Sequence, residues 1–87
     1  FSIQIYYIMK IELINDDFEP QEALEILTKL IHVNIKFHLD KINVSSNKID
    51  INMRETRIKR LQKHLFEISE HIEMLNSQIT IQSSVTL

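Results

Sequence analysis

The chain has 87 residues, a formal net charge of -2 at pH 7 and 44% hydrophobic residues, with no glycine, no cysteine and one proline. The missing cysteines exclude disulfides, thiolate metal sites and nucleophilic thiols, and the missing glycines exclude the glycine-rich loops that bind nucleotide phosphates. No apolar run approaches the roughly 20 residues of a membrane span. We therefore expect one cytoplasmic domain over residues 1–87, with no cofactor, no metal and no membrane association.

The N-terminal segment alternates apolar and polar side chains, which predicts a half-buried strand. Its apolar side consists of Phe1, Ile3, Ile5, Tyr7, Met9, Ile11 and Leu13. Because the chain starts at Phe1 and has a methionine at position 9, we treat residues 1–8 as a candidate non-native extension. The ordered strand is then expected in the second half of this segment, ending where "NDDFEP" begins at Asn15.

A helix is predicted from about Glu19 to Ile42 or Asn43. Pro20 suits a first helical position, acidic residues cluster near the positive helix end, and a periodic apolar run follows. Asn43 is the expected left-handed C-cap in a chain without glycine.

The second predicted helix covers about Asp50 to Leu75, and Ser46, Asp50 and Asn52 compete as its N-cap. From Ile58 onward its apolar residues are spaced alternately by three and four, as in a coiled coil. These apolar residues are Ile51, Ile58, Leu61, Leu65, Ile68, Ile72 and Leu75.

The C-terminal segment again alternates, with Ile79, Ile81, Val85 and Leu87 on one side, and predicts a second strand. The order strand, helix, helix, strand indicates an α+β fold in which a long antiparallel helical hairpin carries a two-stranded antiparallel sheet. Such a sheet is barely stable alone and has two open edges, so we expect it to extend across a homodimer.

The two helices differ in the width of their apolar faces. The second helix has a stripe about 100° wide, whereas the apolar residues of the first spread over about 200° of its circumference. One partner helix cannot cover such a face. We therefore expect the first helix to pack against the second helix on one side and against the sheet or another subunit on the other.

Three polar residues, Asn34, His38 and Lys41, fall on one line of that wide face. One interpretation is a polar seam that fixes the register between helices or subunits, with Lys41 reaching solvent. Another is a small ligand site with His38 as an acid or base, and a third is a helix that bends and leaves all three residues exposed.

The second helix also carries His64, Glu67 and His71 on its outer face. These residue types bind zinc, but His64 and His71 are two turns apart, and an ordinary solvated face explains the same residues. We assign no metal site to them.

Charge is divided between the two ends of the predicted helical hairpin. Acidic residues collect at its open end, and lysine and arginine collect toward its closed tip, where Arg54, Arg57, Arg60 and Lys63 are candidate contacts for an anion. No aromatic residue lies among these cations to stack on bases, and the net charge gives no general indication of nucleic-acid binding.

The start of the first helix, Phe18-x-Pro20-x-Glu22-Ala23, and the segment Ile35 to His38 resemble small bacterial proteins built around a helical hairpin flanked by strands. No activity is established for those proteins, so the resemblance implies the fold and no catalytic residue. A ribbon-helix-helix repressor also places a strand before two helices, but its helices are much shorter and it has no C-terminal strand.

These observations predict a non-enzymatic, self-associating structural or interaction module. The alternative is a protein that binds anions or nucleic acid through the basic tip. An enzyme is third, because His38 beside Asn34 is its only candidate site.

Overall fold

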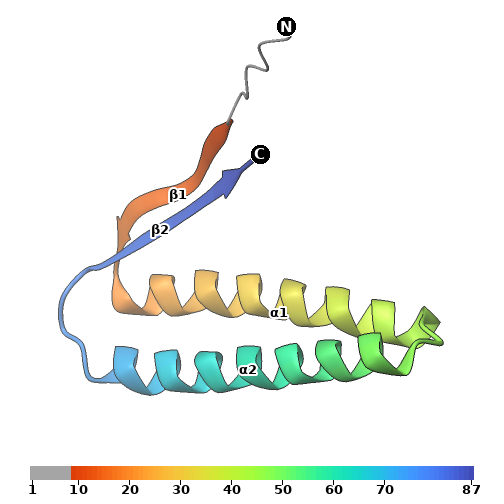
Figure 1. The fold of residues 1–87 in the computed structure, drawn as a ribbon. Helices are drawn as coiled ribbons and strands as arrows, with labels where there is room; N and C mark the ends of the chain where they lie inside the picture. Colours follow the sequence, from red (N-terminus) through yellow and green to blue (C-terminus); the bar gives the residue numbers. More distant parts are fainter. Residues whose placement is uncertain (1–8) are drawn as a thin grey trace, which may run out of the picture.

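The computed structural model describes residues 9–87 and contains four elements, β1 (Lys10–Phe18), α1 (Pro20–Val44), α2 (Lys48–Glu73) and β2 (Ile79–Thr86). The helices run side by side in opposite directions, and the antiparallel strand pair projects from their open end at an angle to α1 (Figure 1). The predicted α+β fold, with its helical hairpin and two-stranded antiparallel sheet, is confirmed. The candidate extension, residues 1–8, lies outside the described residues.

β1 continues past the point where the sequence predicted its end. Asp16 and Asp17 belong to the strand and pair with Ile81 and Thr80 of β2, and the Thr80 hydroxyl donates a hydrogen bond to the Asp17 carboxylate. Aspartate is a poor strand former in isolation, but cross-strand contacts decide strand propensity more than the residue type does. The expected end at Asn15 was therefore wrong.

A β-bulge in β1 changes which residues share its apolar side. Glu12 pairs with Ser84 and Ile14 pairs with Ser83, so Leu13 is an extra residue between two paired positions. Its pairing with Ser83 places Ile14 on the same side as Ile11, whereas Leu13 has no partner on β2 and is 61% exposed. Leu13 thus does not continue the apolar side that simple alternation predicted.

α1 begins and ends with backbone geometry that requires no glycine. At its start, Pro20 follows Glu19, whose backbone N–H donates to the Glu22 carboxylate at 3.3 Å. At its end, Ser45 is extended and its N–H donates to the Ile42 carbonyl at 3.2 Å. The predicted left-handed cap at Asn43 was wrong, since Asn43 lies inside the helix and no described residue has a positive φ.

α2 is capped by Asn47, which is not among the N-caps predicted from the sequence. The Asn47 side-chain oxygen accepts hydrogen bonds from the N–H groups of Ile49 and Asp50, at 2.9 and 3.2 Å. This interaction satisfies two of the four N–H groups that a helix start leaves free. The candidates Ser46, Asp50 and Asn52 were therefore wrong, and the helix starts two residues earlier than predicted.

The core that these elements enclose is small. In the described part of the chain, only five hydrophobic residues are buried, namely Ala23, Ile31, Ile58, Ile72 and Ile81. The molecule measures 56 × 39 × 15 Å, and its radius of gyration of 17.4 Å exceeds the roughly 12 Å of a compact domain of this length. The helices and strands therefore form a thin, angled body with little interior.

Candidate functional site

One candidate surface is a row of exposed apolar residues along α1. Leu30, Val33 and Phe37, here called the α1 stripe, are spaced by three and four residues and so lie on one side of the helix. Val33 is 69% exposed and Phe37 is 53% exposed. The stripe lies to one side of the residues that face α2, such as Ile31. α2 approaches it at Phe37, whose ring centre is 6.0 Å from Arg54 Cζ.

A second exposed apolar surface lies at the free end of the strand pair. Ile11 pairs with Val85, and Met9 and Leu87 exchange backbone hydrogen bonds of 3.2 and 2.7 Å. Positions two residues apart on a strand share a side, so these four residues form one surface, here called the strand-pair face. All four are exposed, whereas Ile81, on the same side nearer the helices, is only 7% exposed.

The polar residues predicted on the wide face of α1 are separated by the structure. His38 is buried between the helices at 7% exposure, whereas Asn34 and Lys41 are exposed. The Asn34 amide donates to the Leu30 carbonyl of its own helix at 3.3 Å, and the Lys41 ammonium lies 5.6 Å from the centre of the Phe37 ring. Within one copy, His38 alone of the three contacts the second helix through a hydrogen bond.

His38 is part of a network that crosses the helical hairpin near its tip. The Arg54 Nη1 group donates to His38 Nδ1 at 3.0 Å, and Arg54 Nε donates to the Asp50 carboxylate at 3.1 Å. A guanidinium group can only donate, so Nδ1 accepts and the neutral ring carries its proton on Nε2. The acceptor nitrogen of the imidazole is therefore occupied, and His38 has no free lone pair with which to act as a general base in this geometry.

The surroundings of His38 favour its neutral form. Burial lowers the pKa of His38 below its usual value, because a charged imidazolium would lose its hydration. The positive charges of Arg54 and Arg57 lower this pKa further, and the carboxylate of Asp50 opposes them. His38 is thus a buried neutral hydrogen-bond acceptor that holds Arg54 in place.

His38 and Arg54 were predicted separately, as a residue of the polar line on the first helix and as an anion contact, and Asp50 was predicted only as a possible cap. The sequence does contain one indication that His38 and Arg54 lie opposite each other. Residues at equal distances from the turn of an antiparallel hairpin face each other, and His38 and Arg54 are each eight positions from Ser46. The spacing of four between Asp50 and Arg54 also favours an ion pair along one helix.

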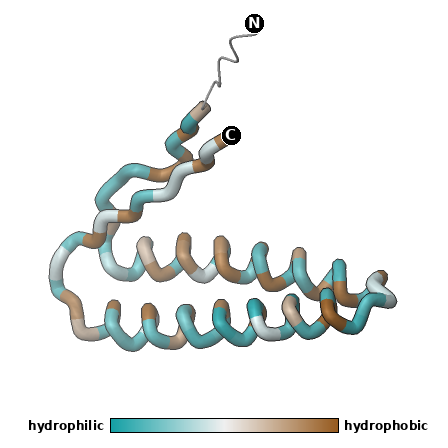
Figure 2. The backbone as a smooth tube through the Cα atoms, in the orientation of Figure 1, coloured by the Kyte–Doolittle hydropathy of each residue, from teal (hydrophilic) through white to brown (hydrophobic). Residues whose placement is uncertain are grey.

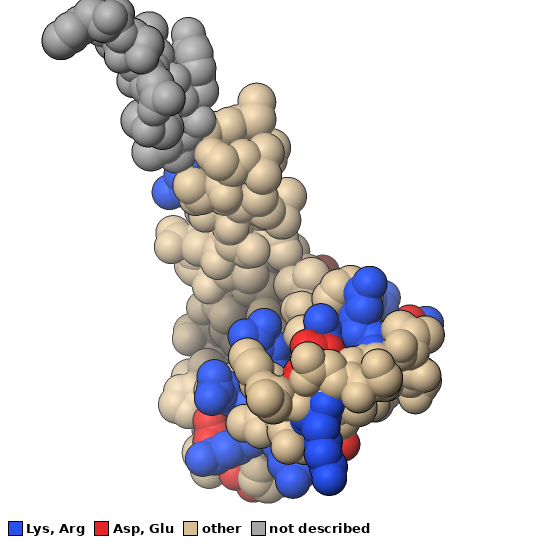
Figure 3. All heavy atoms as spheres, turned by 45° about the vertical axis from the view of Figure 1, so that its right-hand side comes forward, with Lys and Arg blue, Asp and Glu red and all other residues tan. Residues whose placement is uncertain are grey.

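The four candidate anion contacts fall into two groups. Arg54 is engaged by Asp50 and His38, and Lys63 lies 3.9 Å from the Glu67 carboxylate. Arg57 and Arg60 instead line a surface depression of about 330 Å³, together with Asn52, Met53 and Thr56. Neither arginine forms an ion pair with a carboxylate of residues 9–87. Figure 3 shows lysine and arginine side chains gathered around this end of the molecule.

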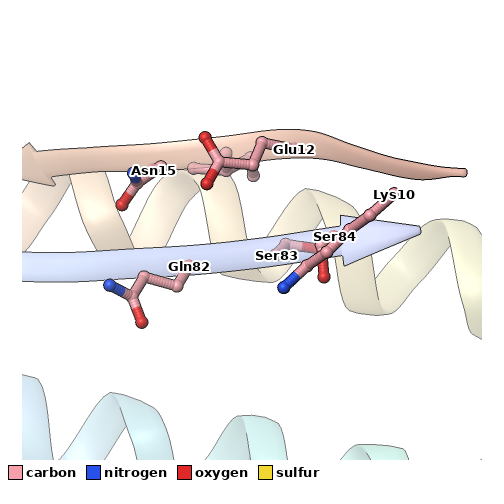
Figure 4. Close-up of a pocket in the computed structure, with 7 residues that line it drawn as sticks. Lys10, Glu12, Asn15, Gln82, Ser83 and Ser84 are labelled. Atoms are coloured by element: carbon pink, nitrogen blue, oxygen red, sulfur yellow. The ribbon is translucent and has the colours of Figure 1, made fainter. Parts of the chain in front are cut away.

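The polar side of the strand pair forms another depression of about 330 Å³, opposite the strand-pair face (Figure 4). Glu12 and Asn15 contribute from β1, and Gln82 and Ser84 contribute from β2. These four side chains are exposed. Nothing in this depression encloses a ligand or orients a reactive group.

The outer face of α2 brings two of the three possible zinc-binding residues together. His64 Nδ1 lies 3.8 Å from the Glu67 carboxylate, at exposed positions. No group of three or more histidine, aspartate or glutamate side chains suited to holding a metal ion occurs within residues 9–87.

Comparison of the chain with protein-family models, curated proteins and solved structures finds no match. The order of elements that the sequence resemblance implied is present in the structure, but the comparisons do not support a bacterial origin. Neither helix, within the described residues, has the length and apolar character needed to cross a membrane.

Proposed function

We propose that this chain is a non-enzymatic self-association module whose fold is completed by a second copy of itself. The observation that supports this most is the contrast between five buried hydrophobic residues and the exposed apolar α1 stripe and strand-pair face. A small domain with so little core usually requires a disulfide, a metal or an oligomer to be stable. The chain has no cysteine, which leaves association as the simplest means of stabilisation.

The proposed assembly is a homodimer in which the α1–α2 pair packs as a coiled coil. Its support is the heptad spacing of α2, where Ile58 and Ile72 are buried and the intervening Leu65 is half-buried. The cytoplasm is the proposed compartment, because a chain without cysteine needs no oxidising environment to fold.

Light scattering during size-exclusion chromatography tests the proposal. We expect the unaltered chain to elute with about twice its mass of 10.4 kDa at micromolar concentration. Val33→Lys should shift the mass toward one copy, because a charge in the α1 stripe would be buried at the interface.

Phe66→Lys is the matched control. Phe66 is also exposed in the middle of a helix, but it lies on α2 away from the α1 stripe, so this variant should keep the mass of the unaltered chain. A monomeric, folded unaltered chain would contradict the proposed function.

The alternative is anion binding at the tip, and the observation that favours it is the depression shared by Arg57 and Arg60. Arginine donates in a planar fork that fits phosphate oxygens, and here Asn52 and Thr56 add polar groups beside it. A phosphate polymer such as RNA is the ligand class that this arrangement suits.

Retention on heparin and RNA binding across a salt series test this alternative. Binding should weaken steeply with salt and be lost in Arg57→Glu/Arg60→Glu. The control Lys29→Glu/Lys59→Glu makes the same change in net charge at exposed helical positions outside the depression, and should retain most of the binding. Equal losses in both variants would rule out a site at Arg57 and Arg60.

A further inference from the structure

The α1 stripe and the strand-pair face occupy the two arms of one open angle. Figure 1 shows the strand pair leaving the N-terminal end of α1 and diverging from the helix along its length. In the hydropathy view, hydrophobic segments occur along both arms (Figure 2). The two exposed apolar surfaces therefore lie on different arms of the molecule.

One copy cannot bring these two surfaces together. Both strands contact α1, and at the point where the arms meet, Ala23 is fully buried and Ile81 nearly so. Ile26, four residues before Leu30 on the same side of α1, is half-buried, whereas Leu30, Val33 and Phe37 beyond it are exposed. The strand pair thus covers the beginning of α1 and then moves away from it.

A second copy can cover the exposed apolar surface on each arm. In a two-fold dimer every contact occurs twice, so the strand-pair face of one copy can cover the α1 stripe of the other while its own stripe is covered in return.

The charge distribution favours the same arrangement. The half of the helical hairpin nearer its tip contains Lys41, Lys48 and Arg57, whereas the open end contains Asp17, Glu22 and Glu73. When two copies place their α1 helices in opposite directions, each acidic end approaches the basic tip of the partner. Parallel helices would instead bring like charges together.

We infer that the chain forms a reciprocal dimer in which the strand-pair face of each copy packs on the α1 stripe of the other, with Ile11 and Val85 against Val33 and Phe37. This inference rests on the proposed function, since it specifies the geometry of the self-association. It assigns the partner, a second copy of this chain, and the surface that the partner covers.

Disulfide cross-linking tests this geometry directly, because the sequence has no cysteine of its own. The single variants Val33→Cys and Val85→Cys are prepared separately, mixed, allowed to exchange subunits and oxidised. The reciprocal dimer predicts that the 33–85 heterodimer is the main cross-linked product, in several-fold excess over the 33–33 and 85–85 products.

Gln82→Cys mixed with Val33→Cys is the matched control. Gln82 lies on the polar side of β2, opposite Val85, so this pair should form few cross-links. Light scattering before oxidation shows whether each variant still associates.

The outcomes separate the two proposals. Monomeric variants together with a monomeric unaltered chain would contradict both self-association and the reciprocal geometry. A dimer that cross-links mainly through 33–33 or 85–85, or as readily through position 82, would contradict the reciprocal geometry while self-association stands.

Discussion

His38 shows how one buried polar side chain fixes the contact between the helices near their tip. It is the only buried polar residue in the described part of the chain, and its partner Arg54 is held in turn by Asp50. A buried acceptor without a donor costs about 1–3 kcal/mol, so this pairing favours one register of α1 on α2. His38 thus acts in the structure as a neutral hydrogen-bond acceptor.

Acid should destabilise the protein through His38. Because burial and the neighbouring arginines lower its folded-state pKa, the unfolded state binds a proton more readily. The contribution of neutral His38 to stability is fully present above the unfolded-state pKa of about 6.5. It is lost as the pH falls toward the lower folded-state pKa. Urea unfolding should give a smaller free energy of unfolding at pH 5 than at pH 7.5. The difference due to His38 cannot exceed about 1.4 kcal/mol for each pH unit by which folding lowers its pKa.

His38→Leu is the control for this pH effect. The substitution removes the titrating group, and Arg54 keeps its bond to Asp50, so the variant should stay folded and lose less stability between pH 7.5 and pH 5 than the unaltered chain. An unchanged pH dependence would show that other groups cause it.

At the scale of whole elements, the start of α2 depends on Asn47. Its side chain accepts two backbone hydrogen bonds, and replacing such a cap with alanine typically costs about 1 kcal/mol. Asn47→Ala should therefore lower the midpoint of urea unfolding. Asn52→Ala, at an exposed position inside α2 where alanine is the better helix former, should leave the midpoint unchanged or raise it. Equal effects of the two variants would contradict the assignment of the cap.

The bulge in β1 leads to a second comparison between neighbouring residues. Ile14 is half-buried on the apolar side, whereas Leu13 is exposed. Ile14→Asp should reduce the free energy of unfolding by about 1–3 kcal/mol, and Leu13→Asp should change it by less than about 0.5 kcal/mol. Chemical denaturation measures both values. The reverse order would mean that the strand follows simple alternation.

The order of the elements could be predicted because strands and helices impose different apolar periods, two residues and 3.6 residues. The bulge at Leu13 could not be predicted, since it depends on which residues of β2 lie opposite. The His38–Arg54 contact required the exact position of the turn. The sequence places several capping residues between Ser45 and Asn52, and the choice of Asn47 became clear only in the structure.

At the scale of the whole molecule, two thin layers of secondary structure meet at one end and enclose little. The strand pair covers only the beginning of α1, so the remaining stripe and the strand-pair face are both exposed. Burying a large apolar side chain contributes about 1.5–3 kcal/mol, and several such side chains remain in water on each arm. A second copy that covers them would therefore supply a large part of the stability of the fold.

The dependence of stability on chain concentration tests this account most directly. Urea unfolding followed by circular dichroism should be measured at chain concentrations that span about 100-fold. If folding and association are coupled, mass action requires the midpoint to rise with concentration. A midpoint that stays constant over this range, with a cooperative transition, would show that a single copy folds by itself and would contradict the account.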